Sequence, residues 1–100
     1  LSGAPAWAEK VKAHLSCEGT FTVPQKGVGS TKSSWTHTIT ERQGGIFVDG
    51  QKCVVTETDY FCTGPRIDIF INRVDLSSMK LTKEFLFVHD GKCRIVKRKL

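Results

Sequence analysis

Several features that would mark a metal protein, a redox enzyme or a membrane protein are scarce in this 100-residue chain. No run of apolar residues approaches the length of about 18 that a membrane-spanning helix needs. The four cysteines form neither a Cys-x-x-Cys pair nor a metal-ligand spacing, and no serine lies in a Gly-x-Ser-x-Gly turn. These absences weigh against a zinc site, a dithiol redox site and a nucleophilic hydrolase, so the residues predict no enzyme and no cofactor.

The cysteines themselves, Cys17, Cys53, Cys62 and Cys93, are the most informative feature that is present. An even number in a small chain predicts two structural disulfides, which form and persist in oxidising compartments. We therefore expect a periplasmic or secreted protein. Residues 1–8 (Leu-Ser-Gly-Ala-Pro-Ala-Trp-Ala) agree with this, because their Ala-x-Ala pattern is typical of a signal-peptidase site.

The same amino-terminal segment has a second interpretation, a short helix. Pro5 suits an early helical position, and Trp7, Val11 and Leu15 follow at a four-residue spacing. The two interpretations are compatible and both stay open. Beyond them we expect a single β domain over residues 9–100, since a chain of this length forms one small core.

Polar and apolar residues alternate through most of the chain, with β-branched and aromatic residues in excess, as half-buried strands require. Three sets share a face in this way: Trp35, His37 and Ile39; Ile67, Ile69 and Ile71; Met79, Leu81, Phe85 and Phe87. Three dipeptides that contain glycine predict hairpin turns: Gly44-Gly45, Asp49-Gly50 and Asp90-Gly91. The expected strands are 15–23, 34–41, 45–48, 51–57, 59–63, 66–73, 79–88 and 92–98.

These short spacings favour antiparallel neighbours. We expect an all-β fold, an antiparallel meander of about eight strands that forms a small lipocalin-like barrel or a two-sheet sandwich. A tight turn near Glu57 would place Cys53 directly opposite Cys62, within disulfide reach. That leaves Cys17 and Cys93 to join the first strand to the last.

The formal net charge is +5, from 15 lysines and arginines against 10 aspartates and glutamates. A basic balance favours acidic partners. The densest basic segment is formed by Lys92, Arg94, Lys97, Arg98 and Lys99. It predicts either a solvated edge strand protected from aggregation or a patch that binds an acidic protein or anionic glycan. Nucleic acid is disfavoured because no stacking aromatics are interleaved with these charges.

Two further patterns predict no metal and no phosphate site. His14, His37 and His89 lie on three separate elements without ligand spacing, and His37 is expected to be hydrogen-bonded on a half-buried face. Residues 27–33 (Gly-Val-Gly-Ser-Thr-Lys-Ser) lack the glycine that a phosphate loop places before its lysine, and a strand pattern follows instead of a helix. A basic loop is the better interpretation.

Four short motifs lie near the two ends of the chain: residues 15–20 (Leu-Ser-Cys-Glu-Gly-Thr), 71–74 (Ile-Asn-Arg-Val), 81–84 (Leu-Thr-Lys-Glu) and 91–93 (Gly-Lys-Cys). Together they resemble small exported bacterial proteins of unknown function. The resemblance implies a compact β meander whose first and last strands each offer a cysteine, and it implies no activity. The chain differs from that pattern at Asp75-Leu76, where Thr-Gly is usual, and in its extra Cys53 and Cys62.

These observations lead to a first hypothesis, a non-catalytic exported binding protein, such as an inhibitor or immunity factor, with an acidic macromolecular partner. The alternative is a lipocalin-like carrier of a small apolar ligand, because a barrel of about eight strands encloses little more than side chains or one small ligand. An enzyme would require a histidine and a carboxylate that converge in a cleft.

Overall fold

The computed structural model of this chain describes residues 10–23, 30–84 and 86–96, which form nine strands and no helix. The strands are β1 (Lys10–Thr22), β2 (Thr31–Arg42), β3 (Gly45–Val48), β4 (Gln51–Lys52), β5 (Val54–Val55), β6 (Asp59–Thr63), β7 (Ile67–Asn72), β8 (Ser77–Thr82) and β9 (Phe87–Val96). All pairings are antiparallel, in the order β4-β3-β2-β1-β9-β8-β7-β6-β5. The expected all-β antiparallel meander is confirmed.

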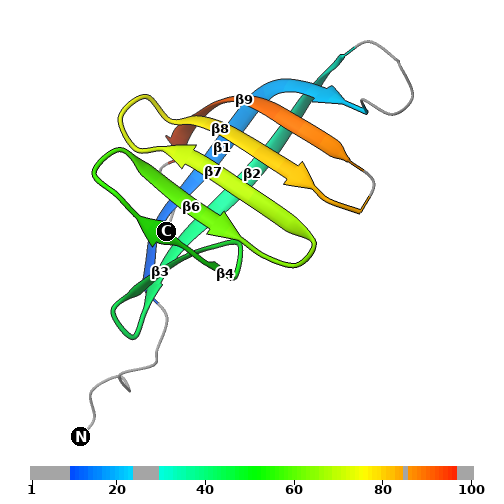
Figure 1. The fold of residues 1–100 in the computed structure, drawn as a ribbon. Coiled ribbons are helices and arrows are strands. Elements are labelled where there is room, and N and C mark those ends of the chain that lie inside the picture. The colour runs from blue at the N-terminus through cyan, green and yellow to red at the C-terminus, as the bar shows by residue number, and fades with distance from the viewer. Residues whose placement is uncertain (1–9, 24–29, 85, 97–100) are drawn as a thin grey trace, which may run out of the picture.

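The two outermost strands of this sheet, β4 and β5, are neighbours in the chain and are separated by Cys53 alone. The sheet therefore curls until its edges meet, and β6 to β8 cross β1 and β2 at a steep angle (Figure 1). Gln51 holds the seam, because its side-chain Nε2 donates hydrogen bonds to the carbonyl oxygens of Cys62 (3.2 Å) and Ile67 (2.9 Å). Of the two expected architectures, the chain adopts the barrel-like one.

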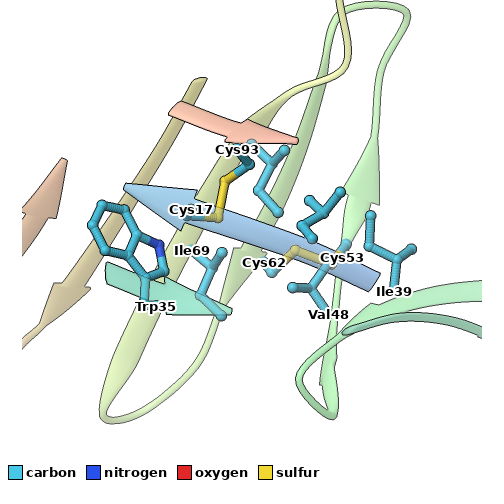
Figure 2. Packing of buried hydrophobic residues seen from close by; sticks show 10 residues of the cluster. Cys17, Trp35, Ile39, Val48, Cys53, Cys62, Ile69 and Cys93 are labelled. Carbon is cyan, nitrogen blue, oxygen red and sulfur yellow. A yellow bond between two sulfur atoms is a disulfide. The ribbon is translucent and has the colours of Figure 1, made fainter. Parts of the chain in front are cut away.

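Alternate residues of the strands point into the barrel and form its core. The buried apolar cluster consists of Leu15, Cys17, Trp35, Ile39, Val48, Cys53, Cys62, Ile69, Ile71 and Cys93 (Figure 2). The faces expected for β2 and β7 are confirmed, since Trp35, His37 and Ile39 of β2 and Ile69 and Ile71 of β7 are buried. Thr40, which alternation places on the other face of β2, is buried as well. This small core is supplemented by two covalent links.

Both disulfides form with the expected pairing. Cys17 of β1 lies directly opposite Cys93 of β9, and Cys62 of β6 is bonded to Cys53, which precedes β5 (Figure 2). In the chain-entropy treatment, the Cys17–Cys93 loop contributes about 4–5 kcal/mol and the Cys53–Cys62 loop about 2.5–3 kcal/mol. The first bond joins the strands where the two halves of the meander meet, and the second closes the seam.

The turns near residue 50 were predicted more accurately than the last turn. Asp49 and Gly50 form a two-residue turn with φ angles of 50° and 84°. The turn expected at Gly44-Gly45 lies one residue earlier, because Arg42 pairs with Gly45.

The turn expected at Asp90-Gly91 is wrong, because Gly91 lies inside β9 and pairs with Gly19 of β1. A Cβ atom on Gly91 would lie 2.0 Å from the carbonyl oxygen of Glu18, so this glycine allows two strands to approach closely. The expected strands 79–88 and 92–98 are therefore replaced by β8 and β9, with the turn between Thr82 and Phe87.

The amino-terminal interpretation is also changed. Val11 and Leu15 lie in β1, so the helix that would have stacked them four residues apart is wrong for this part of the chain. Residues 1–8, which include Trp7 and were assigned to a signal remnant or a helix, lie outside the described residues.

Strand β8 turns toward the core the face opposite to the one that its apolar residues suggest. Directly opposite residues share a face, and Ser78 and Lys80 of β8 lie opposite the buried Ile71 and Ile69. Ser78 is consequently buried, whereas Met79 points outward and is 40% exposed. The apolar Met79 and Leu81 of β8 are therefore on the outer surface of the barrel, whereas Ser78 and Lys80 face its interior.

Candidate functional site

The outward face of β8 continues a row of apolar side chains across four strands. Val54 lies opposite Phe61, Phe61 opposite Phe70, and Phe70 opposite Met79. We call these four residues the outer apolar row. Val54 is 67% exposed, Phe61 38% and Met79 40%, and the Phe61 and Phe70 rings meet edge to face with centroids 6.0 Å apart. Contiguous exposed apolar surface of this kind is typical of binding sites.

A hollow of about 180 Å³ borders this row. Phe70 and Met79 line it together with the polar residues Asp59, Asn72, Ser77 and Asp90. We call it the acidic hollow, because two carboxylates and no lysine or arginine line it among the described residues.

The polar groups at the floor of the acidic hollow are held in place by neighbouring loops. The side-chain oxygen of Asn72 accepts hydrogen bonds from the backbone amides of Val74 (2.8 Å) and Asp75 (3.0 Å). Asp59 accepts a hydrogen bond from the Thr58 hydroxyl at 2.6 Å. Together with the apolar row, this surface suits a segment that carries both an apolar and a cationic side chain.

The predicted basic patch is only partly described. Lys92 and Arg94 are exposed on the outer face of β9, whereas Lys97, Arg98 and Lys99 lie outside the described residues. Lys92 lies opposite Glu18 on β1. Hydrogen bonds from Ser77 lower the pKa of Asp75, with a smaller contribution from Lys92, so that lysine has two acidic neighbours. Its charge is thus partly balanced on the surface.

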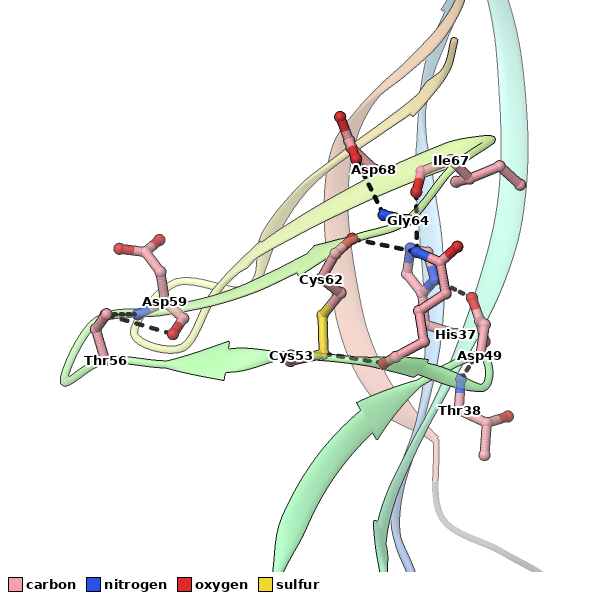
Figure 3. Close-up of a disulfide and its surroundings, with 11 residues drawn as sticks. His37, Thr38, Asp49, Cys53, Thr56, Asp59, Cys62, Gly64, Ile67 and Asp68 are labelled. Atoms are coloured by element: carbon pink, nitrogen blue, oxygen red, sulfur yellow. Dashed lines mark hydrogen bonds and ion pairs between the residues drawn. A yellow bond between two sulfur atoms is a disulfide. The ribbon is translucent and has the colours of Figure 1, made fainter. Parts of the chain in front are cut away.

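A buried histidine connects distant parts of the barrel. His37 of β2 lies 2.6 Å from the Asp49 carboxylate through Nδ1 and 3.2 Å from the Ser78 hydroxyl through Nε2 (Figure 3 shows the Asp49 side). The Thr38 amide donates to the other Asp49 oxygen at 2.8 Å. Burial alone would raise the pKa of Asp49, but the bonds from His37 and Thr38 outweigh it and lower that pKa.

Asp49, His37 and Ser78 are connected in the order of a catalytic triad. Because His37 and Ser78 are buried, the three residues have a structural role in this conformation. A nucleophilic hydroxyl must contact its substrate, whereas Ser78 is 3% exposed and His37 1%. The network instead joins β2, the β3–β4 turn and β8 across the interior. The expectation that His37 is hydrogen-bonded is confirmed. Alternation gave no signal for Ser78, because its strand appeared to face the other way.

The carrier hypothesis depends on interior space. Besides the acidic hollow, a wider and open hollow of about 740 Å³ lies on β1 and β2, lined by Glu18, Gly19, Thr20, Lys32, Ser33 and Ser34. Neither hollow is lined by the apolar side chains of the core. Residues 27–29 of the expected basic loop lie outside the described residues. Residues 31–33 belong to β2, which begins at Thr31 and so starts three residues before the expected strand 34–41.

Two classes of site are missing from the part of the chain that the structure describes. There, no group of three or more His, Cys, Asp or Glu side chains could hold a metal ion. The same residues contain no helix with the length and apolarity needed to cross a bilayer.

Comparison of the chain with family models, with curated proteins and with solved structures finds no match. The site must therefore be interpreted from its own geometry.

Proposed function

We propose that this chain is an exported, non-catalytic binding protein that recognises a macromolecular partner through the outer face of β5 to β8. Two disulfides fit folding in an oxidising compartment, either the periplasm or outside the cell. They brace the two junctions of the barrel, so that the binding face is rigid before it meets its partner. A rigid, preorganised face is the kind that an inhibitor or an immunity factor uses.

The outer apolar row carries this proposal. Four apolar residues lie in consecutive cross-strand register beside two carboxylates, and three of them are exposed while Phe70 is half-buried. A partner that inserts an apolar side chain against Phe70 and Met79 can place a lysine or arginine next to Asp59 and Asp90. The partner is therefore a protein segment with adjacent apolar and cationic side chains. This differs from the acidic partner that the net charge suggested.

Affinity capture from a periplasmic extract with matched variants tests the proposal. Phe61→Thr combined with Met79→Thr removes the centre and one end of the row while keeping residues that favour strands. Val74→Thr is the control, because Val74 is 77% exposed but lies outside the row. We expect the wild type and the Val74 variant to retain the same protein and the double variant to lose it.

Two results would contradict this assignment. Retention of the same protein by the double variant would exclude the row. Loss of retention on Lys92→Glu with Arg94→Glu, together with release by salt, would place the site on the basic patch and restore the acidic partner.

A further inference from the structure

A second, separate feature lies inside the barrel, at the end where β1 leads toward β2 and β8 toward β9. The register puts Phe21 opposite His89, His89 opposite Lys80, and Phe87 opposite Thr82, so that these side chains share the inner face. Trp35 lies on the same face, opposite Cys17. We call Phe21, Trp35, Phe87 and His89 the aromatic end of the barrel.

The four rings of the aromatic end are in contact. Ring centroids are 4.8 Å apart for Phe21 and His89, 5.4 Å for Phe21 and Phe87, and 5.2 Å for Trp35 and His89. Phe21, Phe87 and His89 are half-buried, whereas Trp35 is 9% exposed. The cluster thus runs from a deep indole to phenylalanines at the rim.

Two buried nitrogen atoms of this cluster have no hydrogen-bond partner among the described residues. They are Nε1 of Trp35 and Nδ1 of His89. An unpaired buried polar group is costly, so native proteins rarely retain one without a reason. The indole nitrogen is a donor only and requires an acceptor.

Lys80 adds a positive charge to the same place. It lies on the inner face opposite His89 and has no ion pair with a described carboxylate. Its charge lowers the pKa of Asp49, but that carboxylate is exposed on the β3–β4 turn and is bonded to His37. Burial lowers the pKa of His89, and the charges of Lys80 and His37 lower it further. The aromatic end therefore holds an indole donor without an acceptor, next to a lysine that has no ion pair among the described residues.

We propose that the aromatic end binds a small amphipathic carboxylate, whose anionic group lies against Trp35 Nε1 and Lys80 and whose apolar part packs on Phe21 and Phe87. The anion would satisfy the indole donor and balance the lysine. Both nitrogens are shielded from solvent, so the ligand can enter only after a rim phenylalanine changes its rotamer. Only the fraction of molecules in this open form binds the ligand, and the apparent affinity is lower in proportion to that fraction. This site is independent of the outer face and gives the carrier hypothesis a specific ligand chemistry.

Binding can be followed at the indole itself. The chain has two tryptophans, so a Trp7→Phe background leaves one indole N–H signal in a nitrogen–proton spectrum. Decanoate is the probe and decanol the uncharged control. We expect decanoate to shift the Trp35 signal and to raise the pKa of His89, and to bind at least about tenfold more tightly than decanol.

Variants separate the anion site from general apolar binding. Lys80→Met is expected to weaken decanoate binding about 10- to 100-fold, as loss of a charged hydrogen bond does, and to leave decanol binding unchanged. Lys92→Met, on the outer face of β9, is the control and should change neither. Two results would overturn the proposal: an unmoved Trp35 signal at saturating decanoate in the wild type, or equal binding of both probes with equal effects of the two lysine variants.

Discussion

Strands β7 and β8 lie side by side and both alternate, yet they place opposite kinds of residue in the core. β7 buries Ile69 and Ile71, whereas β8 buries Ser78 and turns Met79 outward. The inverted polarity of β8 supplies the hydroxyl that binds His37, the interior lysine and one end of the outer apolar row. Strand β8 therefore contributes residues to both candidate sites.

The largest expected difference between the two strands is in stability. Ile71→Ala removes a fully buried side chain and should lower the free energy of unfolding by about 2–5 kcal/mol. Met79→Ala, on the exposed face of β8, should change it by about 0.5 kcal/mol or less. Urea unfolding measures both. Equal losses for the two variants would mean that Met79 is in the core.

A smaller effect is expected from the polar side of β8. Ser78→Ala leaves Nε2 of His37 without a partner in the interior, which should cost about 1–3 kcal/mol. Ser34→Ala, at an exposed position on β2, is the control and should stay within about 0.5 kcal/mol. A Ser78 variant as stable as the control would show that the buried network does not join β2 to β8.

The pH dependence of stability sharpens the comparison further, because both shifted interior groups act in the same direction. The pKa of His89 is below its usual 6.5, so the unfolded chain binds a proton first as the pH falls below 6.5. The pKa of Asp49 is below 3.8, so its contribution is present above 3.8 and is lost as the pH falls further. Both groups make the protein less stable in acid.

Thermal unfolding at a series of pH values, for the wild type and for His89→Phe, measures this effect. The decline that begins near pH 6.5 should disappear in the variant, while the decline below 3.8 should remain. A wild type that gains stability between neutral pH and pH 5 would contradict the direction assigned to His89, and a gain below pH 3.8 would contradict the one assigned to Asp49.

The sequence predicted the architecture because its strongest signals are local. Alternation located β2 and β7, and Asp49-Gly50 located a hairpin. The even cysteine count predicted two disulfides, and the expected turn between Cys53 and Cys62 selected their pairing. Gly91 misled because a glycine that permits close packing of two strands looks like one that permits a turn.

The candidate sites were harder to predict because they depend on which face of a strand is inside. That choice is made by pairing with the next strand, as when Ile71 fixes the direction of Ser78. The outer apolar row and the aromatic end each combine residues from several strands, and neither leaves a motif in the linear sequence.

The orientation of β8 can be tested on a single atom, because Met79 is the one methionine in the chain. Dilute hydrogen peroxide converts exposed methionine to its sulfoxide, and mass spectrometry reports the rate. Oxidation should proceed in the native protein within a few-fold of the rate in urea. Strong protection of Met79 in the native state would place it in the core and contradict both the inverted strand and the sites built on it.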